Sequence, residues 1–342
     1  MSIKKTLALF VGAALILGAA ATSASAKEIR WGTSRVGSSG HRAVTNLANV
    51  MQGKLGDYNI TVQPMPGAIF TVKSYASGKI EAYYGADIAF YEYANNIKRF
   101  KGFKAQAKRD PVQSFWAFTV EMGVGIHARD VGKINNWGDL GGKDFFTGPR
   151  PWDTRAQLER ALEALNVNFN YKEVSTKTAG ALLQSGSYQA FGVYTNAEAT
   201  TAGWIQQASL QTDWASLNPS AAEVAKLKAA GFAVVQVPTK VFGKPKTHVE
   251  MATLLPFYYG LHLGMDVPAK DMYNILKTIE ANVGALAQAD KGFKQVEKDM
   301  VGMQVKGVNS SVDLVKIHPG LAMYMKEKGV WQSKWDSRIA TK

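Results

Sequence analysis

The feature that most constrains the fold of this chain is the alternation of short β-like runs with segments of helical periodicity. IRWGT at 29–33 and NITVQPM at 59–65 are strand-like, and each precedes a segment whose apolar residues recur three and four positions apart. The second of these segments, 69–77, is predicted to end at Ser77-Gly78, because glycine readily takes the left-handed conformation that closes a helix. This order predicts an α/β fold with a largely parallel sheet.

The same order returns after residue 121. Strands are predicted at 122–128 and 190–197, and a helix at 154–166, where Thr154 and Gln157 have the spacing of a capping box. From residue 239 onward the chain is predicted to be mainly helical. At about 150 residues per domain, the 342 residues indicate two domains.

The N-terminus has the pattern of a secretory signal peptide. Lys4 and Lys5 precede an almost wholly apolar run at 6–22, and Ala24-Ser25-Ala26 forms a small-x-small site. A transmembrane anchor is the alternative, but the run is shorter than the ~20 residues that a bilayer requires. We therefore expect cleavage after Ala26 and a mature protein outside the cytoplasm.

Composition narrows the possible functions. The formal net charge is +13, and removal of Lys4 and Lys5 leaves +11, which suits an anionic ligand, an acidic partner or a negatively charged membrane surface. Export, and the lack of a nucleic-acid motif, argue against nucleic acid. With no cysteine, no metal-ligand spacing among the five histidines and no G-x-S-x-G motif, we expect no metal, no cofactor and no catalysis. An exported hydrolase remains an alternative.

The turn WGTSRVGSSGH at 31–41 is the first candidate site. It lacks the lysine of a phosphate-binding P-loop, and its glycines do not have the G-x-G-x-x-G spacing of a dinucleotide fold. What remains is a strand that turns into a helix, whose free N–H groups attract an anion. Ser34, Arg35 and Ser38 could add donors, although a plain turn with a serine cap explains the same residues.

TGPRPWDTR at 147–155 is a second turn of the same kind. It leads into the predicted helix at 154–166 and carries Arg150 and Arg155, and surface arginines on an ordinary turn are again the alternative. One anion-binding helix start in each predicted domain suits a ligand held between two α/β lobes.

Five segments together resemble a known family. They are WGTSRVGSSG (31–40), PMPGAIFTVKSYASGKIEA (64–82), ADIAFYEYA (86–94), INNWGDLGGKDFFTGPRPWDT (134–154) and HPGLAMYMKEKGVW (318–331). In order and spacing they are similar to the TAXI family of TRAP-transporter solute-binding proteins, over nearly the whole chain after residue 26.

The resemblance implies a periplasmic protein with a two-lobed α/β fold of the type II periplasmic-binding-protein kind and the ligand in the interlobe cleft. In this fold we expect 27–121 to begin lobe I, 122–238 to form lobe II, and 239–342 to complete lobe I. It implies a receptor, expected to be a monomer, that captures a small organic anion such as glutamate, a dicarboxylate or a related carboxylate. The receptor would deliver this ligand to a sodium-coupled TRAP-type membrane permease. Arg150, Trp152 and Asp153 stand where the family has small residues. An aromatic acid, a sulfonate or a phosphonate therefore remains an alternative ligand, and a ligand sensor for a membrane signalling partner an alternative role.

Position in these turns and strand ends selects the predicted ligand contacts. Arg150 is the first choice and Arg35 the second, because guanidinium binds carboxylate in a bidentate manner. Further predicted contacts come from the helix start after Pro66-Gly67 and from the polar end of the strand at 190–197. The full set is Ser34, Arg35, Ser38, Ala68, Ile69, Tyr91, Arg150, Asp153, Thr154, Arg155, Tyr194 and Thr195.

Overall fold

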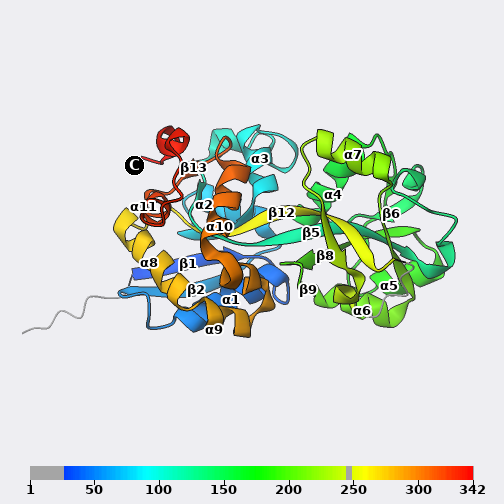
Figure 1. Cartoon of the computed structure of the whole chain (residues 1–342), viewed down its shortest axis with the longest axis horizontal. Coiled ribbons are helices and arrows are strands. Elements are labelled where there is room, and N and C mark those ends of the chain that lie inside the picture. Colours follow the sequence, from blue (N-terminus) through cyan, green and yellow to red (C-terminus); the bar gives the residue numbers. More distant parts are fainter. Residues whose placement is uncertain (1–26, 244–248, 342) are drawn as a thin grey trace, which may run out of the picture.

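The computed structural model describes residues 27–243 and 249–341, so the predicted signal peptide lies outside the described residues. Two α/β lobes lie side by side and are joined by two long strands, β5 (Trp116–His127) and β12 (Met251–Leu263) (Figure 1). The predicted fold class, a two-lobed α/β fold of the type II periplasmic-binding-protein kind, is confirmed. The predicted division at 121–122 falls within β5, and the three-part division of the chain stays a prediction.

The first lobe contains both ends of the described chain. Its strands are β1 (Lys27–Thr33), β2 (Tyr58–Pro64), β3 (Ala82–Ala86), β4 (Val112–Gln113) and β13 (Lys316–Ile317). Its helices are α1 (Ser39–Met51), α2 (Ala68–Ala76), α3 (Asp87–Ala94), α8 (Ala269–Ala281), α9 (Val283–Ala289), α10 (Lys294–Ser311) and α11 (Pro319–Glu327). The C-terminal helices α8 to α11 thus return to the lobe where the described chain begins (Figure 1).

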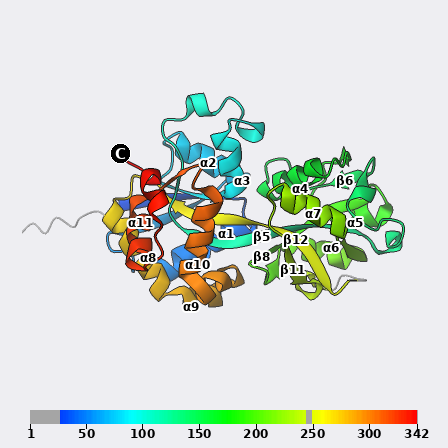
Figure 2. The same cartoon turned by 45° about the horizontal axis from the view of Figure 1, so that its top comes forward.

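The second lobe is built from the middle of the chain. Its strands are β6 (Asp144–Phe146), β7 (Asn170–Tyr171), β8 (Ala190–Asn196), β9 (Thr200–Thr201), β10 (Trp214–Leu217) and β11 (Val235–Pro238). Its helices are α4 (Asp153–Ala164), α5 (Ala179–Ser185), α6 (Gly203–Gln211) and α7 (Ala221–Ala229). Figure 2 shows these elements grouped around the far halves of β5 and β12.

One mixed sheet runs through both lobes, in the order β2-β1-β3-β12-β5-β8-β6-β7. The pairs at its two ends are parallel, as predicted, but β3–β12, β12–β5 and β5–β8 are antiparallel. The expectation of a largely parallel sheet is therefore wrong for the centre. The reason is geometric, because one strand carries the chain into the second lobe and another brings it back.

Two local predictions had different outcomes. Ser38 caps α1, and its Oγ accepts the N–H of His41 at 3.2 Å. The capping box at Thr154 is wrong, because Trp152 has the extended backbone of the capping position and α4 begins at Asp153. Thr154 is therefore inside the first turn, and its side chain is free for another role.

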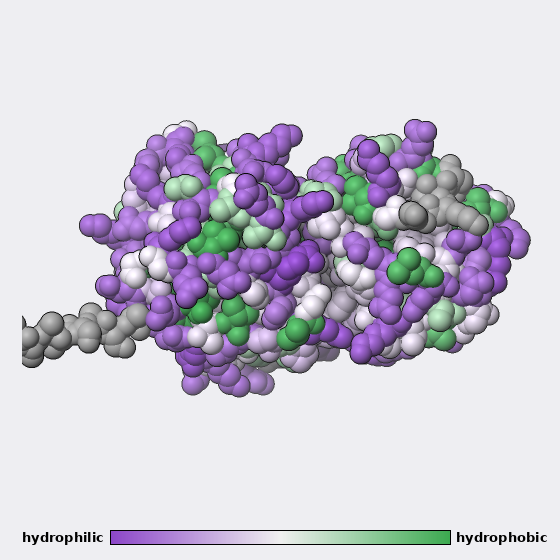
Figure 3. All heavy atoms as spheres, turned by 90° about the horizontal axis from the view of Figure 1, so that it is seen from below, coloured by the Kyte–Doolittle hydropathy of each residue, from purple (hydrophilic) through white to green (hydrophobic). Residues whose placement is uncertain are grey.

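A waist separates the two lobes on the surface. In the view from below, hydrophilic residues gather on both sides of this waist (Figure 3). Contacts across it are close, since a Cβ added to Gly67 would lie 3.3 Å from the carbonyl oxygen of Pro151. The start of α2 in the first lobe thus abuts the turn before α4 in the second.

Candidate functional site

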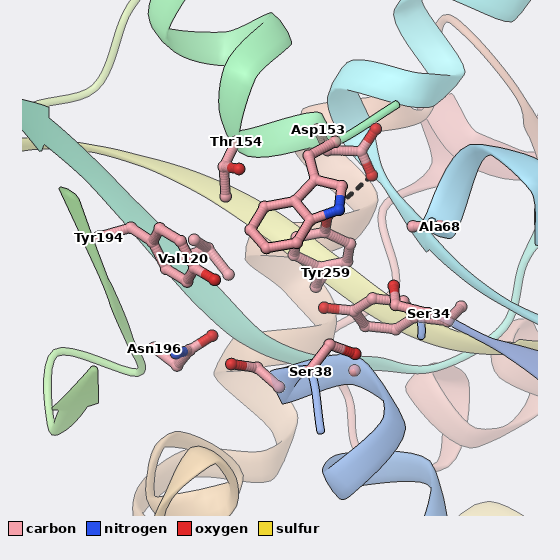
Figure 4. A pocket seen from close by; sticks show the side chains of 13 residues that line it. Ser34, Ser38, Ala68, Val120, Asp153, Thr154, Tyr194, Asn196 and Tyr259 are labelled. Atoms are coloured by element: carbon pink, nitrogen blue, oxygen red, sulfur yellow. Dashed lines mark hydrogen bonds between the residues drawn. The ribbon is translucent and has the colours of Figure 1, made fainter. Parts of the chain in front are cut away.

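Three helices begin at one small cavity between the lobes. Ser38 caps α1, which begins with Ser39 and Gly40; Ala68 begins α2, and Asp153 and Thr154 begin α4. The cavity has a volume of about 40 Å³. Its lining also includes Ser34, Tyr84, Val120, Trp152, Tyr194, Asn196 and Tyr259. Figure 4 shows side chains of both lobes and of the joining strands around it.

Helix starts favour a negatively charged ligand. The first N–H groups of a helix have no acceptor within the helix, and the helix dipole places partial positive charge at the same end. At this cavity α1, α2 and α4 meet from two lobes, so donors approach from several directions. The arrangement can hold an oxyanion without a cationic side chain.

Stacked aromatic rings form one wall of the cavity. The rings of Tyr84 and Tyr259 lie 4.4 Å apart and nearly parallel, at 5°. Burial raises the pKa of both phenols well above the ordinary value, so both keep their protons at neutral pH. The stack requires a glycine at residue 40, because a Cβ there would lie 2.3 Å from Cε1 of Tyr84.

Asp153 lies beside this wall, and both of its carboxylate oxygens are engaged. Oδ1 accepts from Nη1 of Arg99 at 2.6 Å, and Oδ2 accepts from the hydroxyl of Tyr259 at 2.7 Å. Arg99 also donates to Glu92 at 2.7 Å. Burial alone would lower the pKa of Arg99, but the two carboxylates more than offset it and the pKa is raised. A charged network thus ties the first lobe to the start of α4.

Several polar atoms at the cavity are buried without a partner among the residues that the structure describes. They are Oγ of Ser39 and both Oδ1 and Nδ2 of Asn196. Asn196 is 1% exposed and points into the cavity at the end of β8 (Figure 4). Buried polar groups are rarely left without hydrogen bonds in folded proteins. These atoms therefore indicate where a ligand would bind.

The structure brings half of the predicted contacts together at this cavity. Ser34, Ser38, Ala68, Asp153, Thr154 and Tyr194 all line it. Burial raises the pKa of Tyr194 to about 12, so its phenol is neutral and can donate a hydrogen bond. The serines and Ala68 come from the first lobe and the other residues from the second.

The predicted arginines lie elsewhere. Arg35 is exposed and stacks across the interlobe gap over the ring of Trp152, at 5.1 Å. Arg150 is also exposed, and its Nε lies 3.2 Å from Glu173. Arg155 donates to Glu159 at 2.8 Å. None of these arginines lines the 40 Å³ cavity, because their long side chains extend to the rim or the outer surface.

Arg150, Arg155 and Tyr91 instead line an outer cavity of about 700 Å³. It lies between α3 with the following segment 97–99 on one lobe, and α4 with residues 230 and 232 on the other. Its walls mix both charges, and Lys98 pairs with Glu163 across the gap at 3.3 Å. Ile69 is buried and belongs to neither cavity.

Thr195 faces away from the 40 Å³ cavity, and its hydroxyl donates to the buried carboxyl of Glu121 on β5. Successive side chains of a strand point to opposite faces, so Tyr194 and Asn196 share the cavity face. That alternation was the signal in the sequence that could have identified Asn196. Tyr259 was missed because β12 was expected to be helical.

The structure gives two further negative findings. Among residues 27–243 and 249–341, no group of three or more acidic or histidine side chains could hold a metal ion. Within the same ranges every helix is too short or too polar to span a lipid bilayer.

Comparison with known proteins identifies the family. The model of the NMT1-like family matches residues 33–329, so this chain belongs to the NMT1-like family. No significant match is found among curated proteins.

Solved structures resemble the chain at low identity. One is the periplasmic aliphatic sulphonate binding protein SsuA from Escherichia coli, with 13% identity over 87% of this chain and 78% of that chain, at a TM-score of 0.43. Another is a putative L-cystine ABC transporter from Listeria monocytogenes, with 12% identity, 78% and 95% coverage, and a TM-score of 0.45. TM-scores below 0.5 do not define the ligand of this chain.

Proposed function

We propose that this protein is the solute-binding component of a TAXI-type TRAP transporter. It captures a small organic anion, a carboxylate, in the 40 Å³ cavity between its lobes and delivers it to a sodium-coupled membrane permease. It acts as a monomer in the periplasm after cleavage behind Ala26. The observation that carries the proposal is the meeting of α1, α2 and α4 by their N-termini at one small cavity between the lobes.

The chemistry of the lining favours binding over catalysis. Asp153 is the one charged side chain among the described residues that line the cavity, and Arg99 and Tyr259 already engage it. The lining serines have no histidine beside them in this lining, so a hydroxyl nucleophile would lack a general base. Hydrogen-bond donors dominate, as in a receptor for an anion.

The membrane partner is supported by the resemblance of five segments to the TAXI family. A sensor for a signalling protein would use the same ligand cavity, so the partner needs its own test. We expect the ligand-loaded protein to drive sodium-dependent uptake in proteoliposomes that contain the permease encoded beside its gene. Uptake without sodium, or no uptake with this permease, would contradict the transport role.

The binding claim is tested by a thermal-shift screen of the purified protein against small organic acids. A ligand at 100 times its Kd adds about 2.7 kcal/mol to the free energy of unfolding, which is a readily measured shift. Thr154→Met is expected to abolish the shift, because its longer side chain fills the cavity. Arg150→Ala is the matched control and should keep the shift, since Arg150 lies outside. If the two substitutions changed the thermal shift equally, the 40 Å³ cavity would not be the binding site.

A further inference from the structure

We infer that the ligand is a small hydroxy acid with a single negative charge, in which the hydroxyl group is adjacent to the carboxylate. The inference rests on the proposed function and specifies its substrate class. It follows from what the lining of the 40 Å³ cavity can and cannot bind.

The amide of Asn196 requires a partner that both donates and accepts. Its Oδ1 and Nδ2 are buried in the cavity lining, and neither has a partner among the described residues. A ligand hydroxyl can accept from the NH₂ group and donate to the oxygen, whereas a carboxylate can only accept. Exchanging the two amide atoms does not alter the argument, because both are without partners.

The first lobe adds a matching group. Oγ of Ser39, in the first turn of α1, is also buried without a partner in the part of the chain that the structure describes. Ser39 and Asn196 come from different lobes and line the same cavity. A ligand that carries a carboxylate and a hydroxyl on neighbouring atoms can contact the helix starts, Ser39 and Asn196 together.

The charges of the lining argue against ligands with a second charged group. An ammonium would be attracted by a carboxylate without a cation, but the one carboxylate among the described residues of the lining, Asp153, already pairs with Arg99 at 2.6 Å. A second carboxylate would need a cation, and no lysine or arginine occurs among the described residues of the lining. Amino acids and dicarboxylates are therefore expected to bind more weakly than a monoanion.

The size of the cavity sets a further limit. At about 40 Å³ this cavity is far smaller than the outer cavity of about 700 Å³, so it suits a ligand of only a few carbon atoms. The Tyr84–Tyr259 stack and Val120 provide an apolar wall for a short alkyl group. Aromatic acids are too large unless the lobes separate.

The test is calorimetric titration of the purified protein with matched acids, namely lactate against propionate and glycolate against acetate. Succinate, glutamate and methanesulfonate complete the panel. We expect each hydroxy acid to bind at least 10-fold more tightly than its partner without the hydroxyl. Asn196→Ala should remove this preference, so that lactate and propionate bind with similar affinity, as do glycolate and acetate. Ser39→Ala provides a second variant, which should weaken lactate binding.

Asn170→Ala is the control, because this residue of β7 bonds only the Gly142 carbonyl by its side chain, far from the cavity lining. Equal affinity for lactate and propionate, or a preference that survives in Asn196→Ala, would overturn the inference while leaving anion binding intact. Tighter binding of succinate, glutamate or methanesulfonate than of lactate would also overturn the inference. If no acid of any class bound the folded protein, the proposed function itself would fail.

Discussion

At the scale of single residues, Arg99 is the side chain on which the contact between the lobes most depends. It is 15% exposed and lies between Asp153 and Glu92. Replacement by methionine would leave two buried carboxylates without a cation. Removing one partner of a buried ion pair costs about 3–5 kcal/mol. We therefore expect Arg99→Met to lower the free energy of unfolding by about that amount, measured by urea denaturation.

Arg150→Ala is the matched control for this measurement. Its side chain is 69% exposed and pairs with a half-exposed Glu173. Exposed ion pairs contribute about 0–1 kcal/mol, so little change is expected. If both variants lost a similar amount of the free energy of unfolding, the buried ion pairs of Arg99 would contribute no more than an exposed pair.

The sequence predicted which residues occur at the site better than it predicted where their side chains point. Ser34, Ser38, Asp153 and Thr154 were found because glycine-rich turns and helix starts are visible in the sequence. Arginine was favoured for its charge, but none of the three predicted arginines lines the 40 Å³ cavity, where three helices begin. Glu92 is only seven residues from Arg99, but Asp153 is 54 residues away, so no local pattern could indicate that a residue in a basic stretch lies buried between the lobes.

At the scale of elements, the start of α1 depends on its close packing against the aromatic wall. A Cβ at residue 40 would lie 2.3 Å from the ring of Tyr84. Gly40→Ala is therefore expected to destabilise the protein by about 1–3 kcal/mol, the usual cost of overpacking, and to weaken anion binding by displacing the ring. Urea denaturation and calorimetry measure the two effects.

The control for this substitution is Gly284→Ala in α9. Apart from its chain neighbours and its own helix backbone, no atom lies within 4 Å of the Cβ that would be added there, and alanine at a compatible glycine position stabilises a protein by about 0.4–1 kcal/mol because it restricts the unfolded chain. We expect unchanged binding and slightly higher stability. If both glycine variants bound the anion normally, Tyr84 would not form the wall described.

The joining strand β5 makes stability depend on pH. Burial raises the pKa of Glu121 to about 8, although Thr119, Thr195 and the N–H of Glu198 donate to its carboxyl group. The unfolded chain releases this proton near pH 4.5, whereas the native protein keeps it until about pH 8. The free energy of unfolding should therefore fall as pH rises through this window.

Glu121→Gln should flatten this dependence, measured as Tm between pH 5 and 8. Asp87, whose pKa burial raises to about 7, contributes with the same sign at lower pH. Asp87→Asn is thus the control, because its effect should be complete by pH 7, while the effect of Glu121→Gln should extend to pH 8. If the Tm of wild type and of Glu121→Gln changed with pH in the same way, Glu121 would not be the source of the pH dependence.

Local elements were largely predictable, and the elements that join the lobes were not. Strands β1 and β8 and the C-terminal end of α2 have clear local signals, including Gly78 with a φ of 73°. The long strand β12 is buried on both faces, so its sequence MATLLPFYYGLHL lacks the alternation that identifies a half-exposed strand. Antiparallel pairing at the centre depends on how distant segments meet, which local periodicity does not encode.

At the scale of the whole molecule, the site exists only where the two lobes meet. The lining takes α1 and α2 from one lobe, α4 and β8 from the other, and Val120 and Tyr259 from the joining strands (Figure 4). Neither lobe alone presents the full set of donors. Ligand binding and the approach of the lobes are therefore expected to be coupled.

The most direct measurement is a crystal structure of the protein with a small carboxylate that it binds. We predict that the oxygens of this anion accept hydrogen bonds from N–H groups in the first turns of α1, α2 and α4, between the Tyr84–Tyr259 stack and Asn196. An anion held by Arg150 and Arg155 in the outer cavity would contradict that position.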